Sequence, residues 1–519
     1  MSRLPGGLGR STAIFAVWTG VSRIAGLARE ILAAAIFGTQ GSINAFVIAF
    51  QVPNLLRSLV ADSALSAAFV PVFTQLEEEG RRREAQRLVG ALIGLITMGL
   101  GLVTLIAIVT APWVMPLFAP GLSDELVDET VQLAQIMFPI VVLLGLTGLV
   151  AAVLQAHGEF GATAFVPVLW NVVIIVGLVA ATPLVPEDDR ITVYAVSIVI
   201  GTVAQLLWLL PSLRGKGPFP LSLGLRSSAV RRVLVLMLPV TLGLGLINVQ
   251  LSIGAIFATL VSEDSPRAID AAFRLYLLPQ GVFSVAIATV LFPTISRLAA
   301  REDVAGMRRT LAEGLRLIFF MLLPASAFLL VLSEPVVRLI YQRGEFDAAS
   351  TALTSDALLF FAIGLAFNGA SLLVIRAFFS LQRPWLPTAV AGLGVVLSTV
   401  LYAILYIPVG TGGIPLGTSI ASIVTFLVLL WLLERELGGL HRGWVLEGSS
   451  RSVVASAVSV LLAWCTWTVL DEWLGRSTLA QVVSVGGAML AALAAYLAAA
   501  QAMEMRELGA LGRLRRPLR

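Results

Sequence analysis

Three arginines stand in apolar stretches near the N-terminus of the chain. Arg23 and Arg29 lie in GVSRIAGLARE, and Arg57 lies in QVPNLLRS. A charged side chain at the middle of a bilayer costs about 2.5 to 3.5 kcal/mol, so it normally faces a cavity or a partner. A guanidinium group can bind phosphate oxygens through two parallel hydrogen bonds. These residues therefore indicate an anion-binding site inside a membrane protein.

A fourth arginine, Arg274, lies in IDAAFRLYLLPQ. The acidic side chains nearest to these arginines in the sequence are Glu30, Asp62 and Asp270. Positive charge is in excess, which favours an anionic ligand. Structural roles are the alternative. Arg29 and Arg274 could reach the outer interface of the membrane. Arg23 could pair with Asp62, and Glu30 could orient Arg29 or only offset its charge.

The elements that hold these arginines are predicted to be transmembrane helices. The chain has 519 residues, of which 58% are hydrophobic and 13% charged, and its mean hydropathy is +0.93. Apolar runs of about 20 residues recur along the chain, as a bilayer core of about 30 Å requires. We predict fourteen helices, the first retained rather than cleaved as a signal peptide. They start near residues 11, 42, 86, 130, 162, 191, 229, 268, 307, 354, 385, 412, 452 and 477.

Basic residues cluster in alternate gaps between the predicted helices. The even-numbered gaps and the termini contain RRREAQR, SRLAAREDVAGMRR and the tail RELGALGRLRRPLR, whereas the odd-numbered gaps are mostly acidic or neutral. The positive-inside rule then predicts that both termini are cytoplasmic. The net charge of +4 reflects this topology and contact with anionic lipids, and it gives no indication of nucleic-acid binding.

Two distant segments resemble each other and indicate an internal repeat. INAFVIAFQVPN (43–54) matches IDAAFRLYLLPQ (269–280), and FVPVFTQL (69–76) matches LFPTISRL (291–298). We predict two pseudo-symmetric six-helix lobes around a central cavity. The N-lobe covers residues 1–222 with helices 1 to 6, and the C-lobe covers 223–443 with helices 7 to 12. Residues 444–519 hold two extra helices and a basic cytoplasmic tail.

Other chemistry finds little support in the residue types. The two histidines, His157 and His441, have no ligand-type neighbours in the sequence, so we expect neither a metal site nor histidine catalysis. No GxxxxGK[ST] motif occurs, so ATP hydrolysis is not expected. We interpret EDD (187–189) as a solvated loop rather than as the site of a metal-dependent glycosyltransferase. Cys465 is predicted to be a small buried hydrophobe, and Arg316 to reach the cytoplasmic surface.

The chain resembles the MurJ (MviN-type) family of lipid II flippases, in the MOP exporter superfamily. The resemblance rests on motifs that occur in order: SRIAGLARE followed by FG, NAFVIAFQVPNLLR, SAAFVPVF, FRLYLLPQGVFSVAIATVLFP and YQRGEFD. It implies a transporter that is not an enzyme. Such a protein moves undecaprenyl-diphosphate-linked peptidoglycan precursor between the leaflets of the bacterial cytoplasmic membrane by alternating access. Flippases for other polyprenyl-diphosphate-linked oligosaccharides are the nearest alternative, and a multidrug exporter or a membrane scaffold is a more distant one.

The resemblance also assigns roles to residues. It places cavity arginines at Arg23, Arg29, Arg57 and Arg274, and supporting polar groups at Ser22, Glu30, Asn54 and Asn171. It makes helices 13 and 14 a groove for the lipid tail. Some members bind sodium between helices 7 and 11, but here helix 7 offers Asn248 and Gln250 without a carboxylate, and helix 11 offers Ser398. We therefore expect no cofactor, no sodium coupling and a drive from the membrane potential or protons. The expected partners are lipid II, anionic lipids and the cell-wall synthesis machinery, with the protein a monomer.

Overall fold

The computed structural model describes residues 6–60, 63–224 and 227–509. Within these ranges, the side chains of residues 6–16, 57–60, 63–64, 67, 239–240 and 244 are not described. All regular elements in the described ranges are helices. The chain divides into two compact units, Met1–Pro266 and Arg267–Arg519, and each unit is described separately. This division falls after the predicted lobe boundary at residue 222.

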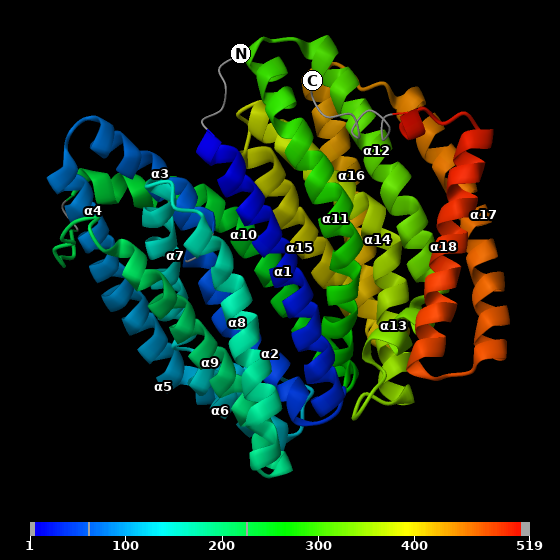
Figure 1. Ribbon diagram of the computed structural model, residues 1–519, viewed down its shortest axis with the longest axis horizontal. Helices are drawn as coiled ribbons and strands as arrows, with labels where there is room; N and C mark the ends of the chain where they lie inside the picture. Colours follow the sequence, from blue (N-terminus) through cyan, green and yellow to red (C-terminus); the bar gives the residue numbers. More distant parts are fainter. Residues whose placement is uncertain (1–5, 61–62, 225–226, 510–519) are drawn as a thin grey trace. The chain divides into compact units, whose positions relative to one another are not determined.

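Unit 1 contains the first ten α-helices (Figure 1). A π-helical segment, Ile96–Leu100, joins α4 to α5. Helix α1 packs on α8, and α10 packs on α2 and α3, which explains why α10 belongs to this unit. The helices are α1 (Gly6–Phe37), α2 (Ser42–Val60), α3 (Ser63–Glu78), α4 (Arg82–Leu95), α5 (Gly101–Phe118), α6 (Asp124–Met137), α7 (Ile140–Ala156), α8 (Gly161–Ala180), α9 (Arg190–Leu209) and α10 (Ser228–Val261).

Unit 2 contains almost all of α11 and the seven α-helices that follow it (Figure 1). Helix α12 packs on α14 and α17, α14 packs on α16, and α17 packs on α18. The helices are α11 (Ser265–Ala300), α12 (Val304–Val331), α13 (Ser333–Tyr341), α14 (Ala348–Ser380), α15 (Trp385–Leu405), α16 (Gly413–Leu437), α17 (Arg442–Leu474) and α18 (Thr478–Ala502).

Among the described residues, 12 helices are long and apolar enough to cross a membrane. Each contains one of the predicted starts from residue 86 onward, except Thr478–Ala502, which begins one residue after its predicted start. The first two predicted spans correspond to α1 and to α2 with α3, of which only Ser42–Leu56 is recorded as a shorter apolar helix. The prediction of many membrane-spanning helices is confirmed, and the count of fourteen stays a prediction.

The two copies of the sequence repeat both form helices with internal prolines. The first copy lies on α2 and α3, with Pro53 and Pro71 inside the helices, and the second lies on α11, with Pro279 and Pro293. Proline inside a helix removes one backbone hydrogen bond and tends to kink the helix. Both copies therefore carry prolines at matched helix positions, although the first copy spans two helices and the second a single one.

Helices α17 and α18 form an antiparallel hairpin, and the turn between them is stabilised by a glycine and a helix-capping serine. Gly475 has φ 74°, which few residues other than glycine adopt, and the Ser477 hydroxyl accepts a hydrogen bond from the Ala480 N–H (3.3 Å). Small side chains such as Ser456 and Ala488 are buried between the hairpin and its neighbours. Such residues let membrane helices approach closely.

Cys465 is exposed on α17, so the prediction that it is buried is wrong. It lies near other exposed apolar side chains of the same helix, including Leu461 at 63% and Val469 at 52%. An outward-facing surface of this kind suits lipid tails as neighbours, because the hydrocarbon is as apolar as the side chains. The error came from assuming that an apolar environment requires protein on all sides.

Candidate functional site

Two of the predicted arginines of unit 1, Arg23 and Arg29, lie on α1, which packs on α8. Asn171 of α8 is buried, and its Nδ2 donates to the Ser22 carbonyl oxygen of α1 (3.4 Å) and to the Pro167 carbonyl oxygen (2.9 Å). Gly26 of α1 faces the same amide, because a Cβ at that position would lie 3.8 Å from it. These contacts fix the face of α1 between Arg23 and Arg29 against α8.

Arg29 is buried and already paired. Its Nη2 lies 2.5 Å from Glu30 Oε1, and its guanidinium carbon lies 4.6 Å from the centre of the Trp170 ring. Arg29 is 7% exposed and Glu30 is 3% exposed. An ion pair and a cation–π contact both offset the cost of a buried guanidinium. Glu30 therefore orients Arg29 and neutralises it at the same time, which joins the two roles that the sequence left open.

Arg23 differs from Arg29 in being exposed. The two residues are six positions apart, which separates them by about 120° around the helix. Arg57 belongs to the described backbone of α2, but its side chain lies outside the described residues, as does Asp62. The predicted roles of Arg23 and Arg57 stay predictions, and Arg23 is the exposed one of the two predicted site arginines on α1.

A polar contact joins α2 to α10 within unit 1. Asn54 Nδ2 lies 3.4 Å from Asn248 Oδ1. In unit 2 the repeat-related residue Gln280 makes a similar contact, because its Nε2 donates to Asn368 Oδ1 of α14 (3.1 Å). Each copy of the repeat thus carries an amide that bonds to another amide on a neighbouring helix of its own unit.

Arg274 of α11 shares a single carboxylate with a second arginine. Its Nε and Nη2 donate to the two carboxylate oxygens of Asp270 (2.9 and 3.3 Å), and Arg267 Nη1 also donates to Asp270 (3.1 Å). The Arg274 side chain is 36% exposed, whereas that of Arg267 is 3% exposed. One carboxylate therefore serves two arginines, and Arg274 is the one that remains accessible.

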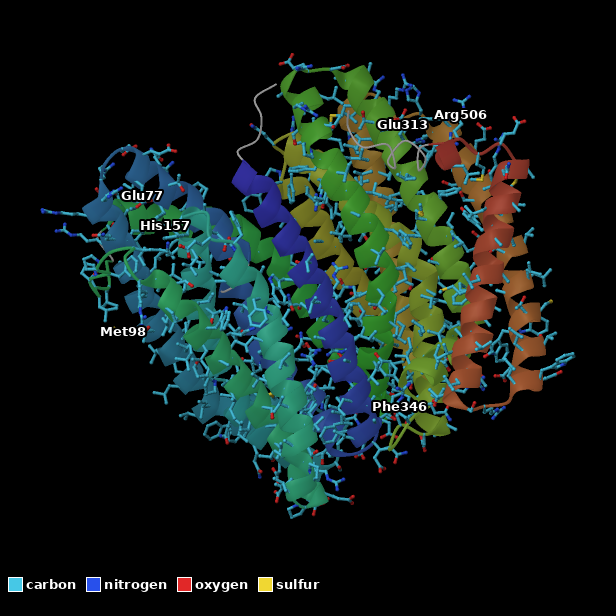
Figure 2. The ribbon with its side chains drawn as sticks, viewed as in Figure 1. Glu77, Met98, His157, Glu313, Phe346 and Arg506 are labelled. Atoms are coloured by element: carbon cyan, nitrogen blue, oxygen red, sulfur yellow. The ribbon has the colours of Figure 1, made fainter. Side chains whose placement is uncertain are left out.

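Metal-binding groups do not gather anywhere in the described ranges. No group of three or more His, Cys, Asp and Glu side chains there could hold a metal ion. His157 has a single acidic neighbour, Glu77, with its Nε2 3.9 Å from Oε1, and both residues lie in unit 1 (Figure 2). Ser398, the polar group predicted for helix 11, is buried, and its hydroxyl donates to the Val395 carbonyl oxygen (3.0 Å).

Two arginines of unit 2, one buried and one partly buried, were not predicted to have partners. Arg316 of α12 bonds through Nε to Glu507 Oε1 (2.5 Å) and lies over the Trp444 ring at 4.5 Å. Its side chain is 5% exposed, so the prediction that it reaches the cytoplasmic surface is wrong. The segment after α18 supplies Glu507 and covers the arginine. We call Arg316, Trp444 and Glu507 the Arg316 cluster.

The second unpredicted arginine is Arg338 of α13. Its Nη2 donates to Asp471 Oδ1 (2.9 Å) and its Nε donates to Gln481 Oε1 (3.0 Å), while Gln481 Nε2 donates to Asp471 (2.8 Å). The guanidinium lies 5.7 Å from the centre of the Trp467 ring. We call these four residues the Arg338 cluster. No sequence signal could have paired them, because α13 and the hairpin are far apart in the chain.

Long apolar helices in two compact units, with paired arginines inside them, define a helical multi-pass membrane protein over the described ranges. A solved structure, "Lipid II flippase MurJ, inward closed conformation", shares this fold with a TM-score of 0.80 at 23% identity, over 96% of this chain and 99% of that one. A "multidrug resistance MATE family transporter of the MOP superfamily" in an inward-facing conformation has a TM-score of 0.68 at 16% identity, over 80% of this chain and 94% of that one.

The chain belongs to the family described as "Lipid II flippase MurJ", which matches residues 33–484. A protein with this name from Burkholderia cenocepacia is 31% identical over 88% of this chain and 90% of its own length. A "Probable lipid II flippase MurJ" from Bdellovibrio bacteriovorus is 27% identical over 98% of this chain and 97% of its own. The resemblance seen in the sequence is confirmed. The family match and the apolar helices together indicate a multi-pass protein of the inner membrane.

Proposed function

We propose that this protein is a lipid II flippase, which moves the undecaprenyl-diphosphate-linked peptidoglycan precursor from the inner to the outer leaflet by alternating access. The observation that carries the proposal is the family match over residues 33–484, together with curated relatives that cover nearly the whole chain. The function serves cell-wall synthesis. A flippase for another polyprenyl-diphosphate-linked oligosaccharide is the alternative that the test below separates.

The diphosphate is the part of the substrate that the arginines recognise. We assign this contact to Arg23, Arg29, Arg57 and Arg274, with Ser22, Glu30, Asn54 and Asn171 in support. The accessibility of these groups supports the assignment, because Arg23 is exposed and the Arg274 side chain is 36% exposed while it pairs with Asp270. Arg29 contributes from a position held by Glu30 and Trp170. Bidentate hydrogen bonds to phosphate oxygens are the contact that guanidinium groups favour.

The proposed topology has fourteen spans in two six-helix lobes, with both termini in the cytoplasm. Twelve candidate spans, together with α1 and the apolar helix in α2, support the count. In unit 2 the segments 296–309 and 435–442 are rich in arginine, as the positive-inside rule requires of cytoplasmic loops. The two extra spans, α17 and α18, are proposed to guide the lipid tail.

We propose that the membrane potential, and not ATP or sodium, drives the transport. Moving one unit charge across 100 mV is worth about 2.3 kcal/mol, so a cavity lined with arginines can respond to the potential. The absence of a Walker motif in the sequence supports independence from ATP. The protein is proposed to act as a monomer, in contact with anionic lipids and the cell-wall synthesis machinery.

Complementation tests the function. The chain is expressed in cells depleted of their own lipid II flippase, alongside the variants Arg23→Ala, Arg57→Ala and Arg274→Ala. We expect the intact chain to restore growth and each variant to fail at equal membrane levels. Arg190→Ala, which changes a partly exposed arginine paired with Glu187, is the matched control and should rescue. If the inserted intact chain does not rescue, the assignment is wrong, and rescue by all three cavity variants would refute the diphosphate contact.

A further inference from the structure

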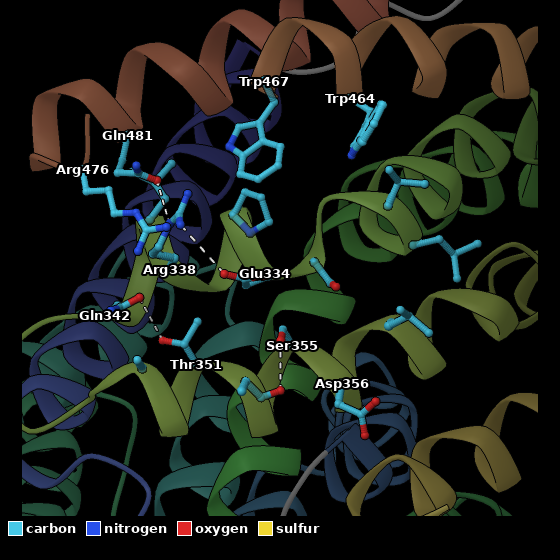
Figure 3. A pocket seen from close by; sticks show the side chains of 18 of the residues that line it. Glu334, Arg338, Gln342, Thr351, Ser355, Asp356, Trp464, Trp467, Arg476 and Gln481 are labelled. Atoms are coloured by element: carbon cyan, nitrogen blue, oxygen red, sulfur yellow. Dashed lines mark hydrogen bonds and ion pairs between the residues drawn. The ribbon is translucent and has the colours of Figure 1, made fainter. Parts of the chain in front are cut away.

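A polar pocket of about 600 Å³ lies within unit 2, between α13, α14 and the α17–α18 hairpin (Figure 3). The helices around it end or begin there: α12 ends at Val331, α14 begins at Ala348, α17 ends at Leu474 and α18 begins at Thr478. Because these are the ends of candidate spans, the pocket lies where hydrocarbon gives way to water. Lipid headgroups occupy that level of a membrane.

Two arginines, Arg338 and Arg476, lie on one side of this pocket (Figure 3). Arg338 is held there by Asp471 and Gln481, and its side chain is 10% exposed. Arg476, in the turn between α17 and α18, lines the pocket beside it (Figure 3). Arg476 is exposed and has no ion-pair partner among the residues that the structure describes. The pocket therefore offers one guanidinium that is fixed and two that are exposed, since Arg343 also lines it and donates from Nη2 to the Leu339 carbonyl oxygen (2.6 Å).

The negative groups complete a charge separation across the pocket. Asp356 of α14 is exposed and lies on the side opposite Arg476 in Figure 3. Glu334 of α13 lies between them, with a side chain that is 60% exposed and an Oε1 that is 3.8 Å from Arg338 Nη1. Since Asp471 pairs with Arg338, the remaining charged residues that line the pocket are two arginines, Arg343 and Arg476, and two acids, Glu334 and Asp356. A dipolar ligand fits such a site better than a purely anionic one.

Two tryptophans of α17, Trp464 and Trp467, form the wall on the hairpin side (Figure 3). The Trp467 Nε1 is buried and has no hydrogen-bond acceptor among the described residues. A buried indole N–H without an acceptor is unfavourable, and a ligand oxygen would satisfy it. Beside the pocket, the hairpin exposes apolar side chains, with Trp473 at 85% and Leu479 at 79%. Tryptophan is enriched at membrane interfaces, and the exposed apolar face suits acyl chains.

We propose that this pocket binds the headgroup of a zwitterionic phospholipid with a primary ammonium group. The phosphate accepts hydrogen bonds from Arg476 and the Trp467 indole, and the ammonium donates to Asp356 and Glu334. The acyl chains lie along the exposed face of α17 and α18. A choline headgroup cannot donate hydrogen bonds to the carboxylates, and a glycerol headgroup brings no positive charge to them. This site is separate from the proposed diphosphate contact and does not depend on it.

Native mass spectrometry of the full-length protein in detergent tests the proposal. The probes are phosphatidylethanolamine, phosphatidylcholine and phosphatidylglycerol with identical acyl chains. We expect the intact protein to retain phosphatidylethanolamine about tenfold more tightly than the other two, a difference of about 1.4 kcal/mol. Arg476→Ala should remove this binding, Asp356→Asn should abolish the preference over phosphatidylglycerol, and Asp356→Lys should reverse it. Arg190→Ala, at a partly exposed arginine of unit 1, is the control and should bind as the intact chain does.

Three results would overturn the proposal. They are equal retention of all three lipids by the intact protein, an unchanged preference in both Asp356 variants, and displacement of phosphatidylethanolamine by equimolar lipid II. Asp356 and Arg476 are both exposed, and equal melting temperatures of the variants and the intact chain will show that they fold. Because the readout is lipid binding, it can fail while complementation succeeds, and the reverse also holds.

Discussion

The α17–α18 hairpin is attached at its two ends by the same three kinds of side chain, yet the two attachments differ in burial. In the Arg316 cluster, Arg316 and Glu507 are each 5% exposed. In the Arg338 cluster, Arg338 is 10% exposed and Asp471 is 15% exposed, and Gln481 bonds to both. Figure 2 places Glu313 and Arg506 at the first end of unit 2 and Phe346 at the other.

The difference teaches that burial and spare partners, rather than the ion pair itself, set the effect of losing one member. A buried charge left without its partner is strongly unfavourable, because the low-dielectric interior does not replace the hydration that the charge has lost. Glu507 has a second carboxylate oxygen that is buried without a hydrogen-bond partner among the described residues. The Arg338 cluster has an amide that can bond to whichever charge remains, and it lies beside an open pocket.

The largest predicted effect is that of Arg316→Ala. We expect the free energy of unfolding to fall by about 3 to 5 kcal/mol, because Glu507 would be left buried and unpaired. Unfolding of the purified protein by denaturant in detergent measures this. Arg309→Ala on the same helix is the control, since its pair with Glu313 is exposed and should contribute at most about 1 kcal/mol. Equal losses in the two variants would contradict the comparison.

Arg338→Ala should be milder. Removing the guanidinium breaks its hydrogen bonds to Asp471 and Gln481, which we expect to cost about 1.5 to 3 kcal/mol. The bond from Gln481 to Asp471 remains and limits the loss. The same unfolding experiment measures this loss. When Arg338→Ala is made in a Gln481→Ala background, the loss of unfolding free energy should come closer to that of Arg316→Ala. A loss in Arg338→Ala as large as in Arg316→Ala would show that burial is not the deciding factor.

Gly448→Ala perturbs the Arg316 cluster by adding a methyl group on α17. A Cβ at Gly448 would lie 2.5 Å from Arg316 Nε and 2.8 Å from its Cζ, so the guanidinium would have to move away from Trp444. We expect a loss of about 1 to 2 kcal/mol in unfolding free energy, typical of overpacking relieved by a flexible side chain. Gly443→Ala is the matched control, because nothing lies within 4 Å of its Cβ. If both variants kept full stability, the prediction would be wrong, because the Arg316 cluster would then accommodate the added methyl group without loss.

The smallest predicted effect concerns Asp347, which caps α14. Its carboxylate accepts a hydrogen bond from the Ser350 N–H (2.8 Å), and this bond lowers the pKa of Asp347. The contribution is present above the ordinary pKa of aspartate and is lost as the pH falls through the lowered value. Asp347→Ala should cost about 0.5 to 1 kcal/mol at neutral pH and less in acid. Asp347→Asn keeps an acceptor and is the control, and unfolding measured at neutral and acidic pH checks the trend.

Much of the secondary structure was predictable because hydropathy is a local property. The starts near residues 86 and 229 fall inside candidate spans, and each needed only a window of about 20 residues to be recognised. The pair Arg29–Glu30 was also within reach, because adjacent residues cannot be far apart. The contacts of Asn171 with Ser22 and of Arg316 with Glu507 were not, since they join residues 149 and 191 positions apart.

The sequence by itself determined that this chain crosses a membrane many times, belongs among lipid-linked precursor flippases, and carries arginines where hydrocarbon would reject them. Composition, periodicity and motif order are properties of short segments or sums over residues, so the amino-acid sequence alone reveals them. Only the tertiary structure decided which charges are already neutralised. Arg29, Arg316 and Arg338 are all held by acids and aromatic rings, whereas Arg23 and Arg476 remain exposed. The physical reason is that pairing depends on distance in space, which packing alone sets.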